Sequence, residues 1–99
     1  MNENVIKYAI KMCENSHAPF SNYCVGAAVE TNSNEIIGGC NIELSSYGLT
    51  CCAERVALFR AIAKGYSKFI SLAVATKNSV MPCGACRQVI WELCGEIPI

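Results

Sequence analysis

The sequence predicts an α/β domain of three layers, in which helices cover both faces of a mixed β-sheet. Segments with helical periodicity alternate with short runs of strand-forming residues, in the order helix, hairpin, helix, strand, helix. The chain has 99 residues, of which 53% are hydrophobic, and both values are typical of one compact domain. We therefore expect residues 1–99 to form a single domain.

Six segments carry the pattern of a regular element. Helices are predicted over 3–14, over 52–64 and from near 83–84 to Gly95, and strands over 24–30, 35–42 and 69–76. Turn-forming residues join the first two strands as a hairpin. Residues 97–99 resemble the beginning of a further strand.

Small residues mark places where elements are expected to approach each other closely. The sequence Gly-Ala-Ala at 26–28 indicates that another element lies against the first strand. Gly38 and Gly39 weaken the second strand and indicate a bulge. The strand over 69–76 has little polarity, so we expect it to be central and covered on both faces.

Charge and hydropathy argue against several classes of protein. Eight basic and eight acidic side chains give a net charge of zero without a basic stripe, which argues against long nucleic acid as a partner. No apolar run approaches ~18 residues, so no membrane span is expected. The N-terminus lacks the basic region of a signal peptide, which favours a cytoplasmic protein. There, eight cysteines are more typical of metal binding or catalysis than of disulfides.

Two short motifs carry the predicted chemistry. Cys52-Ala53-Glu54-Arg55 opens the second helix, and Pro82-Cys83-Gly84-Ala85-Cys86 opens the third. Helix N-termini favour thiolates, which are the form of cysteine that binds metals. Cys52, Cys83 and Cys86 can together bind one Zn²⁺ and leave a fourth position for water, which is the pattern of a catalytic site.

The residues beside Cys52 complete this hypothesis. Glu54 is expected to take a proton from the water and deliver it to the substrate. Zinc with three thiolates carries a net negative charge, and we expect Arg55 to offset it through hydrogen bonds to sulfur. Cys-Ala-Glu followed by Pro-Cys-x-x-Cys is closely related to the signature of zinc deaminases.

On these motifs the sequence resembles the homotetrameric-type zinc-dependent cytidine deaminases. The matching stretches are 18–28, 39–43, 46–50, 52–55 and 82–90. The resemblance implies hydrolytic deamination of cytidine and 2′-deoxycytidine to uridine and 2′-deoxyuridine, with release of ammonia, as in pyrimidine salvage. It also implies one zinc per chain and a homo-oligomer, either a tetramer or a dimer. Chains of that family usually extend further, so we expect a C-terminally truncated version of its fold.

The resemblance further assigns roles to individual residues. It implies zinc on Cys52, Cys83 and Cys86, with Glu54 as the proton shuttle. The implied substrate contacts are Asn41 and Glu43 with the ribose, the Ala53 backbone and Glu54 with the base, Tyr23 with the pyrimidine ring, and Tyr47 with a neighbouring subunit's site. The family commonly has Asn where this chain has Leu44.

The residues alone leave alternatives open. Cys51 could complete a structural site of four thiolates, although Glu54 would then have no task. Asn41 and Glu43 could be turn residues at a strand end. A zinc-stabilised interaction domain without activity, or a deaminase of another small aminopyrimidine such as blasticidin S, are the other functional hypotheses. Trp91 is expected at the surface or, more in keeping with its size, in a subunit interface.

Overall fold

The computed structural model describes residues 3–19, 22–45, 51–76 and 84–95. Its elements are α1 (Glu3–Met12), the 3₁₀ helix η1 (Cys13–Asn15), β1 (Gly26–Thr31), β2 (Ile36–Cys40), α2 (Ala53–Ala63), β3 (Phe69–Ala75) and α3 (Gly84–Cys94). This is the predicted order. The strand expected to begin at 97–99 lies outside the described residues. No helix within the described ranges is long and apolar enough to cross a membrane.

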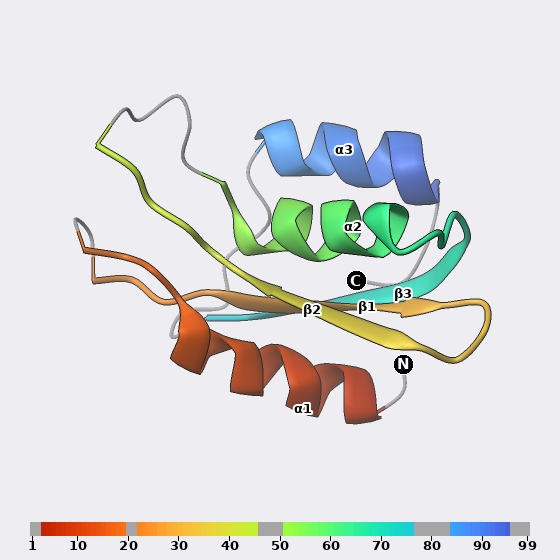
Figure 1. Ribbon diagram of the computed structural model, residues 1–99, viewed down its shortest axis with the longest axis horizontal. Coiled ribbons are helices and arrows are strands. Elements are labelled where there is room, and N and C mark those ends of the chain that lie inside the picture. The colour runs from red at the N-terminus through yellow and green to blue at the C-terminus, as the bar shows by residue number, and fades with distance from the viewer. Residues whose placement is uncertain (1–2, 20–21, 46–50, 77–83, 96–99) are drawn as a thin grey trace.

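The three strands form one sheet in the order β2-β1-β3 (Figure 1). β1 pairs antiparallel with both neighbours, so the described strands contain no parallel pair, and the parallel pairing that a mixed sheet requires stays a prediction. β2 and β3 run in the same direction and are joined by a crossover through α2, but β1 separates them. Among the described strands β3 is therefore an edge strand, not the central one, and its Ile70 side chain is 45% exposed.

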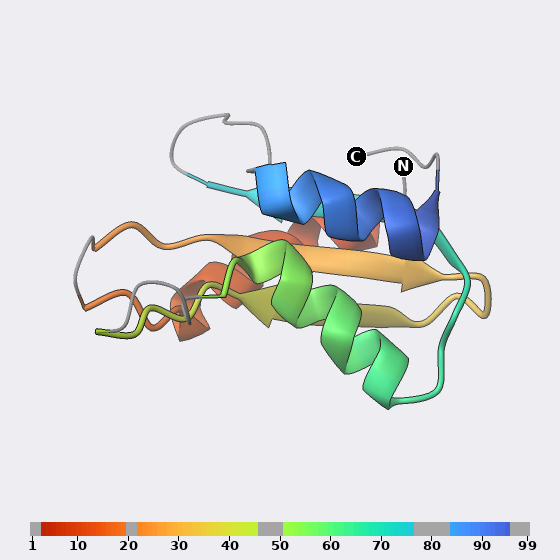
Figure 2. The same ribbon diagram turned by 90° about the horizontal axis from the view of Figure 1, so that it is seen from above.

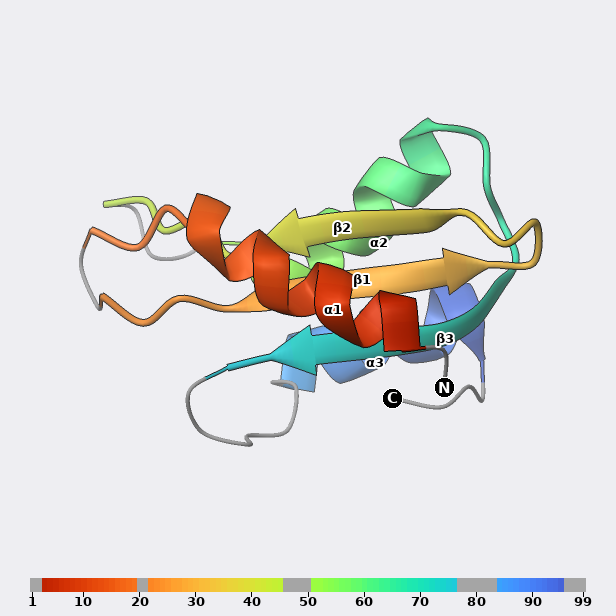
Figure 3. The ribbon, with the colours of Figure 1, turned by 90° about the horizontal axis from the view of Figure 1, so that it is seen from below.

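Helices cover both faces of this sheet, which confirms the predicted three layers. α1 lies on one face, whereas α2 and α3 lie side by side on the other (Figures 1 and 2). In Figure 3, α1 crosses in front of the strands and the other two helices lie behind them. The α1 face buries Val5 and Ala9 against Ala28 and Ala73. Gly26 lies under α1, where a Cβ would be only 2.0 Å from the Ala9 carbonyl oxygen, so the close neighbour predicted for the first strand is α1.

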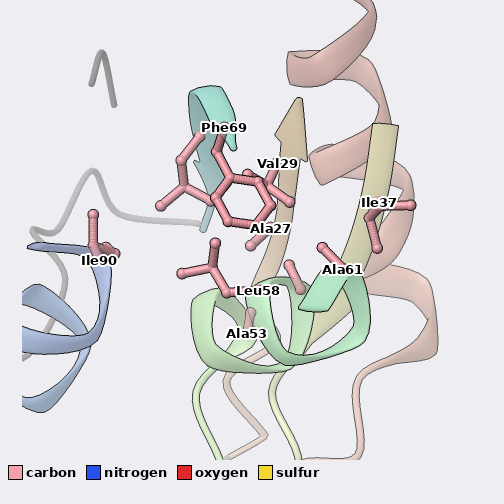
Figure 4. Close-up of a cluster of buried hydrophobic side chains, with 10 residues drawn as sticks. Ala27, Val29, Ile37, Ala53, Leu58, Ala61, Phe69 and Ile90 are labelled. Atoms are coloured by element: carbon pink, nitrogen blue, oxygen red, sulfur yellow. The ribbon is translucent and has the colours of Figure 1, made fainter. Parts of the chain in front are cut away.

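The opposite face holds the larger hydrophobic cluster and fixes α2 to the sheet. Leu58 of α2 is fully buried and points toward Ala27 of β1 and Phe69 of β3, while Ile90 of α3 closes the side of the cluster (Figure 4). Burial of a side chain such as Leu58 contributes about 1.5–3 kcal/mol. This packing determines where the first turn of α2 lies.

Gly38 and Gly39 let the two helix layers approach β2 from opposite sides. A Cβ on Gly39 would be 2.4 Å from the Ala57 nitrogen and 2.8 Å from the Ala53 carbonyl oxygen, whereas a Cβ on Gly38 would meet side chains of α1. The pairing of β2 with β1 is regular through both glycines. The predicted bulge is therefore wrong, and the glycines are explained by close packing of helices on the sheet.

Candidate active site

The first turn of α2 carries the motif predicted to bind metal and to move a proton. Cys52 is the N-cap residue, with extended dihedrals (φ −74, ψ 154) and no capping hydrogen bond from its side chain. Its carbonyl oxygen accepts the helical hydrogen bond from the Val56 N–H at 3.1 Å. The sulfur is thus not used for capping, and the positive end of the helix dipole favours its thiolate form.

Arg55 contacts the sulfur of the predicted metal ligand. Its Nη2 donates a hydrogen bond to Cys52 Sγ at 3.7 Å. The two residues are three apart at the start of one helix, so their side chains lie on the same side. The structure therefore contains the arginine–sulfur contact that the sequence predicted. Its effect on a bound metal stays a prediction.

Glu54 lies at the same helix start and is buried, with 4% of its surface exposed. Ala53 is fully buried, because this turn of α2 lies directly over Gly39 of β2. A carboxylate in the first turn is favoured by the helix dipole. A buried carboxyl group two residues from Cys52 is suited to proton transfer sheltered from bulk water.

The segment that follows β2 runs beside the residue that precedes the motif. Ile42 and Cys51 exchange two backbone hydrogen bonds, each of 2.9 Å. On the other side, the His17 N–H donates to Asn41 O at 3.0 Å and the Glu43 N–H donates to His17 O at 2.8 Å. Three segments distant in sequence therefore meet at the carboxyl end of β2. Asn41 and Glu43 alternate with Ile42 in an extended segment, so their side chains lie on one side of it.

Asn41 is more than a turn residue, because its amide links three segments. Its Oδ1 accepts hydrogen bonds from the Val25 N–H at 3.0 Å and from the Ser16 hydroxyl, and its Nδ2 donates to the Tyr23 carbonyl at 2.8 Å. The side chain is 8% exposed. The sequence does not predict these contacts, since no spacing or motif relates residue 41 to partners 16 to 25 positions earlier.

The structure describes only part of the predicted site. Tyr23 and Glu43 are half-buried near the segments just described. Tyr47 and Cys83 lie outside the described residues, and so does the side chain of Cys86, whose backbone lies in α3. Among the side chains that are described, no three His, Cys, Asp or Glu residues form a metal site. The predicted ligand set, of which Cys52 is the described member, stays a prediction.

Three of the other cysteines, Cys13, Cys40 and Cys94, behave as packed thiols. Cys13 Sγ donates to the Ala75 carbonyl at 3.4 Å, and Cys40 Sγ donates to the Asn15 carbonyl at 3.3 Å. Burial raises the pKa of both thiols and raises the pKa of Cys94 to about 11. Because the thiolate is the reactive form, these cysteines are poor nucleophiles at neutral pH.

Comparison with known proteins decides the family. Residues 1–97 match the family model of the cytidine and deoxycytidylate deaminase zinc-binding region. The chain belongs to this family. It is 50% identical over 92 residues to a cytidine deaminase of Halalkalibacterium halodurans, covering 91% of this chain and 70% of that protein. It is 46% identical over 100 residues to one of Sporosarcina psychrophila, covering 98% of this chain and 74% of that protein.

Solved structures agree with the sequence relatives. Cytidine deaminase from Burkholderia pseudomallei superposes with a TM-score of 0.90 at 46% identity, over 96% of this chain and 77% of that one. The enzyme from Mycobacterium tuberculosis superposes with a TM-score of 0.90 at 33% identity, over 97% and 80%. A blasticidin-S deaminase of Bacillus cereus is also similar, 35% identical over 77 residues, covering 67% of this chain and 54% of that protein.

The metal of this family region is zinc, and the predicted ligand that the structure describes suits it. Cys52 offers a thiol at a helix N-terminus, within a hydrogen bond of the Arg55 guanidinium. Thiolate sulfur is a preferred ligand of Zn²⁺ and a poor ligand of Mg²⁺ or Ca²⁺. The chemistry of this donor therefore fits the zinc-binding region that the chain matches.

Proposed function

We propose that this chain hydrolyses the exocyclic amine of cytidine and 2′-deoxycytidine, giving uridine or 2′-deoxyuridine and ammonia. The observation that carries the proposal is the start of α2, where Cys52, buried Glu54 and Arg55 lie together in a chain that matches the deaminase family over residues 1–97. A thiol that can bind zinc and a buried glutamate that can carry a proton are two parts of the zinc-deaminase signature, and here they share one helix end.

In this proposal Cys52, Cys83 and Cys86 hold the metal. Bound Zn²⁺ supplies Lewis acidity, which lowers the pKa of a water molecule at the site. Three thiolates would weaken that acidity by donating negative charge. The hydrogen bond from Arg55 to Cys52 Sγ withdraws part of this charge from the sulfur, so it helps to keep the site acidic enough at neutral pH.

Glu54 handles the protons. It accepts one from the water that adds to C4 of the pyrimidine and passes it to the ring nitrogen N3. It then takes the proton of the new C4 hydroxyl and delivers it to the amine, so that the C4–N bond breaks, C4 becomes a carbonyl and the nitrogen leaves as ammonia. The burial of Glu54 limits exchange of this proton with bulk water during the transfer.

The substrate contacts follow the family assignment. Asn41 and Glu43 hold the ribose, and their position beside the segment that leads into α2 supports this. The backbone of Ala53 orients the base, and Tyr23 packs on the pyrimidine ring. Tyr47 contributes to the site of a neighbouring subunit.

We further propose that the protein is a cytoplasmic homo-oligomer that serves pyrimidine salvage. The outer surface of α2 and α3 supports the association, because it exposes Phe59, Ile62 and Trp91 at 48%, 42% and 69%. Large exposed aromatic and aliphatic side chains are typical of protein interfaces. Zero net charge and the absence of a basic stripe favour a small nucleoside over a long nucleic acid.

A second candidate is deamination of blasticidin S, favoured by the similarity to the Bacillus cereus enzyme. One assay distinguishes the candidates: ammonia release by the zinc-loaded chain from cytidine, 2′-deoxycytidine, cytosine and blasticidin S. The proposal predicts turnover of the two nucleosides at a higher kcat/KM than the other two compounds. Turnover of blasticidin S alone would establish the second candidate. A folded, zinc-loaded chain that releases no ammonia would instead indicate a non-catalytic zinc-stabilised interaction domain.

A further inference from the structure

The amide of Asn41 is almost fully occupied by contacts within the chain. Its Oδ1 accepts from the Val25 N–H at 3.0 Å and from the Ser16 hydroxyl, while its Nδ2 donates to the Tyr23 carbonyl at 2.8 Å. An amide oxygen accepts two hydrogen bonds, and an amide nitrogen donates two. Both acceptor positions and one donor are therefore used, and one N–H has no partner among the residues that the structure describes.

The backbone partners determine the orientation of this amide. The Val25 N–H can only donate, so it must face the Asn41 oxygen. The Tyr23 carbonyl can only accept, so it must face the Asn41 nitrogen. The Ser16 hydroxyl is then necessarily the donor in its contact with Oδ1. The remaining N–H of Asn41 can only donate, so it suits an acceptor atom such as a sugar hydroxyl oxygen.

Ser16 is itself held firmly. Its backbone N–H donates to the Cys13 carbonyl at 3.2 Å and closes η1, and its dihedrals are φ −57 and ψ 138. The neighbouring His17 pairs with the segment that contains Asn41. The hydroxyl of Ser16 is thus presented by the end of η1, which follows α1, and it donates to the Asn41 side chain.

We propose that Ser16 is a positioning residue for nucleoside recognition. By filling the second acceptor position of Asn41 Oδ1, its hydroxyl holds the free N–H of Asn41 toward the sugar. This inference rests on the proposed function, in which Asn41 contacts the ribose. Because the hydroxyl acts through Asn41 and touches no reacting atom, its loss weakens binding of the sugar and leaves the chemical step unchanged.

The matched pair Ser16→Thr and Ser16→Val tests this assignment. Thr and Val have nearly the same shape, but only Thr keeps the hydroxyl, and the extended dihedrals of residue 16 accept a β-branched side chain. We expect Ser16→Val to raise the KM for cytidine about threefold to tenfold at unchanged kcat, since one neutral hydrogen bond is lost. Ser16→Thr should stay near wild type, as should the control Ser33→Ala in the turn between β1 and β2.

A substrate without the 2′- and 3′-hydroxyls supplies a readout that a general structural defect would not give. With 2′,3′-dideoxycytidine, the wild-type chain and Ser16→Val should share one KM, because neither of these ring hydroxyls is present for Asn41 to bind. The inference is overturned if Ser16→Val raises the KM equally for both substrates or leaves the KM for cytidine unchanged. It is also overturned if Ser16→Thr raises the KM as much as Ser16→Val does. Dissociation constants for cytidine replace KM if turnover is absent.

The same experiment separates this inference from the proposed function. If the wild-type chain turns over cytidine and Ser16→Val leaves the KM unchanged, the proposed function stands and the role of Ser16 is refuted. If the chain binds cytidine without turnover, and Ser16→Val binds it more weakly than Ser16→Thr does, the proposed function is refuted and the role of Ser16 stands. A folded, zinc-loaded chain that neither binds nor converts cytidine overturns both.

Discussion

Arg55 Nη2 lies 3.7 Å from Cys52 Sγ, so a guanidinium donates to the sulfur at the N-terminus of α2. Removal of this donor should leave more negative charge on the sulfur and a less firmly oriented ligand. We expect Arg55→Gln to lower zinc affinity or kcat by about 10–100-fold, the usual effect of losing such an outer contact. Competition with a chelator measures the affinity, and cytidine turnover measures kcat.

Arg60 offers the matched control for this prediction. It is an arginine of the same helix, but it donates to the carbonyl of Gly38 in β2 and not to the cysteine. Arg60→Gln should therefore keep wild-type zinc affinity and kcat. Equal effects of the two substitutions would show that the sulfur contact has no special role.

Gly39 should tolerate a methyl group far less well than its neighbour Gly38. The added Cβ of Gly39→Ala would meet backbone atoms of α2 at Ala57 and Ala53, whereas that of Gly38→Ala would meet flexible side chains of α1. We expect Gly39→Ala to lower the free energy of unfolding by about 1–3 kcal/mol and to reduce activity, because the first turn of α2 must move. Urea denaturation and kcat/KM check this. A Gly38→Ala variant that loses more activity than Gly39→Ala would contradict it.

The raised pKa of Cys94 predicts a loss of stability at alkaline pH. Burial raises this pKa from 9.0 to about 11, so below about pH 9 the thiol is protonated in both folded and unfolded chains. Between these values the unfolded chain binds fewer protons, and the free energy of unfolding falls as pH rises. From about pH 8 to about pH 10.5, wild type should lose more stability than Cys94→Ala in urea denaturation. Parallel losses in the two proteins would show that Cys94 does not contribute.

Trp91 is expected to contribute to association between copies of the chain. It is 69% exposed on α3, and large aromatic side chains dominate the energetics of many interfaces. We expect Trp91→Lys to weaken self-association by about tenfold or more, as measured by light scattering over a dilution series. Ile10→Lys is the control, because Ile10 is 58% exposed on α1, across the sheet. An unchanged oligomeric state in Trp91→Lys would exclude this surface from the interface.

Element boundaries followed from local patterns, but the arrangement of the strands did not. The apolar strand Phe69–Ala75 was expected to be central, yet among the described strands it is an edge strand, with helices packed against both of its faces. Covered faces give the same low polarity in a central strand and in an edge strand, so composition cannot separate the two. Gly38 and Gly39 likewise indicate either a bulge or close packing, and only the position of the helices decides between them.

The part of the candidate site whose residues are neighbours in the sequence could be predicted. Cys52, Glu54 and Arg55 lie within one turn of a helix, so their proximity follows from their spacing. The role of Asn41 in joining Ser16 and Val25 depends on how loops pack at the end of β2, and no local pattern encodes it. Sequence motifs therefore predicted which residues gather at the start of α2 but not the hydrogen bonds that hold the Asn41 amide.

The most direct test of the account compares cytidine turnover by the wild-type chain and by Glu54→Gln, with the zinc content of both measured. Gln keeps the size of the side chain and removes its ability to carry a proton. We predict about one zinc per chain in each protein, and a fall in kcat of about 10²–10⁴-fold or more in the variant. A zinc-loaded Glu54→Gln protein that forms uridine at the wild-type rate would contradict the assignment of Glu54 and, with it, the proposed mechanism.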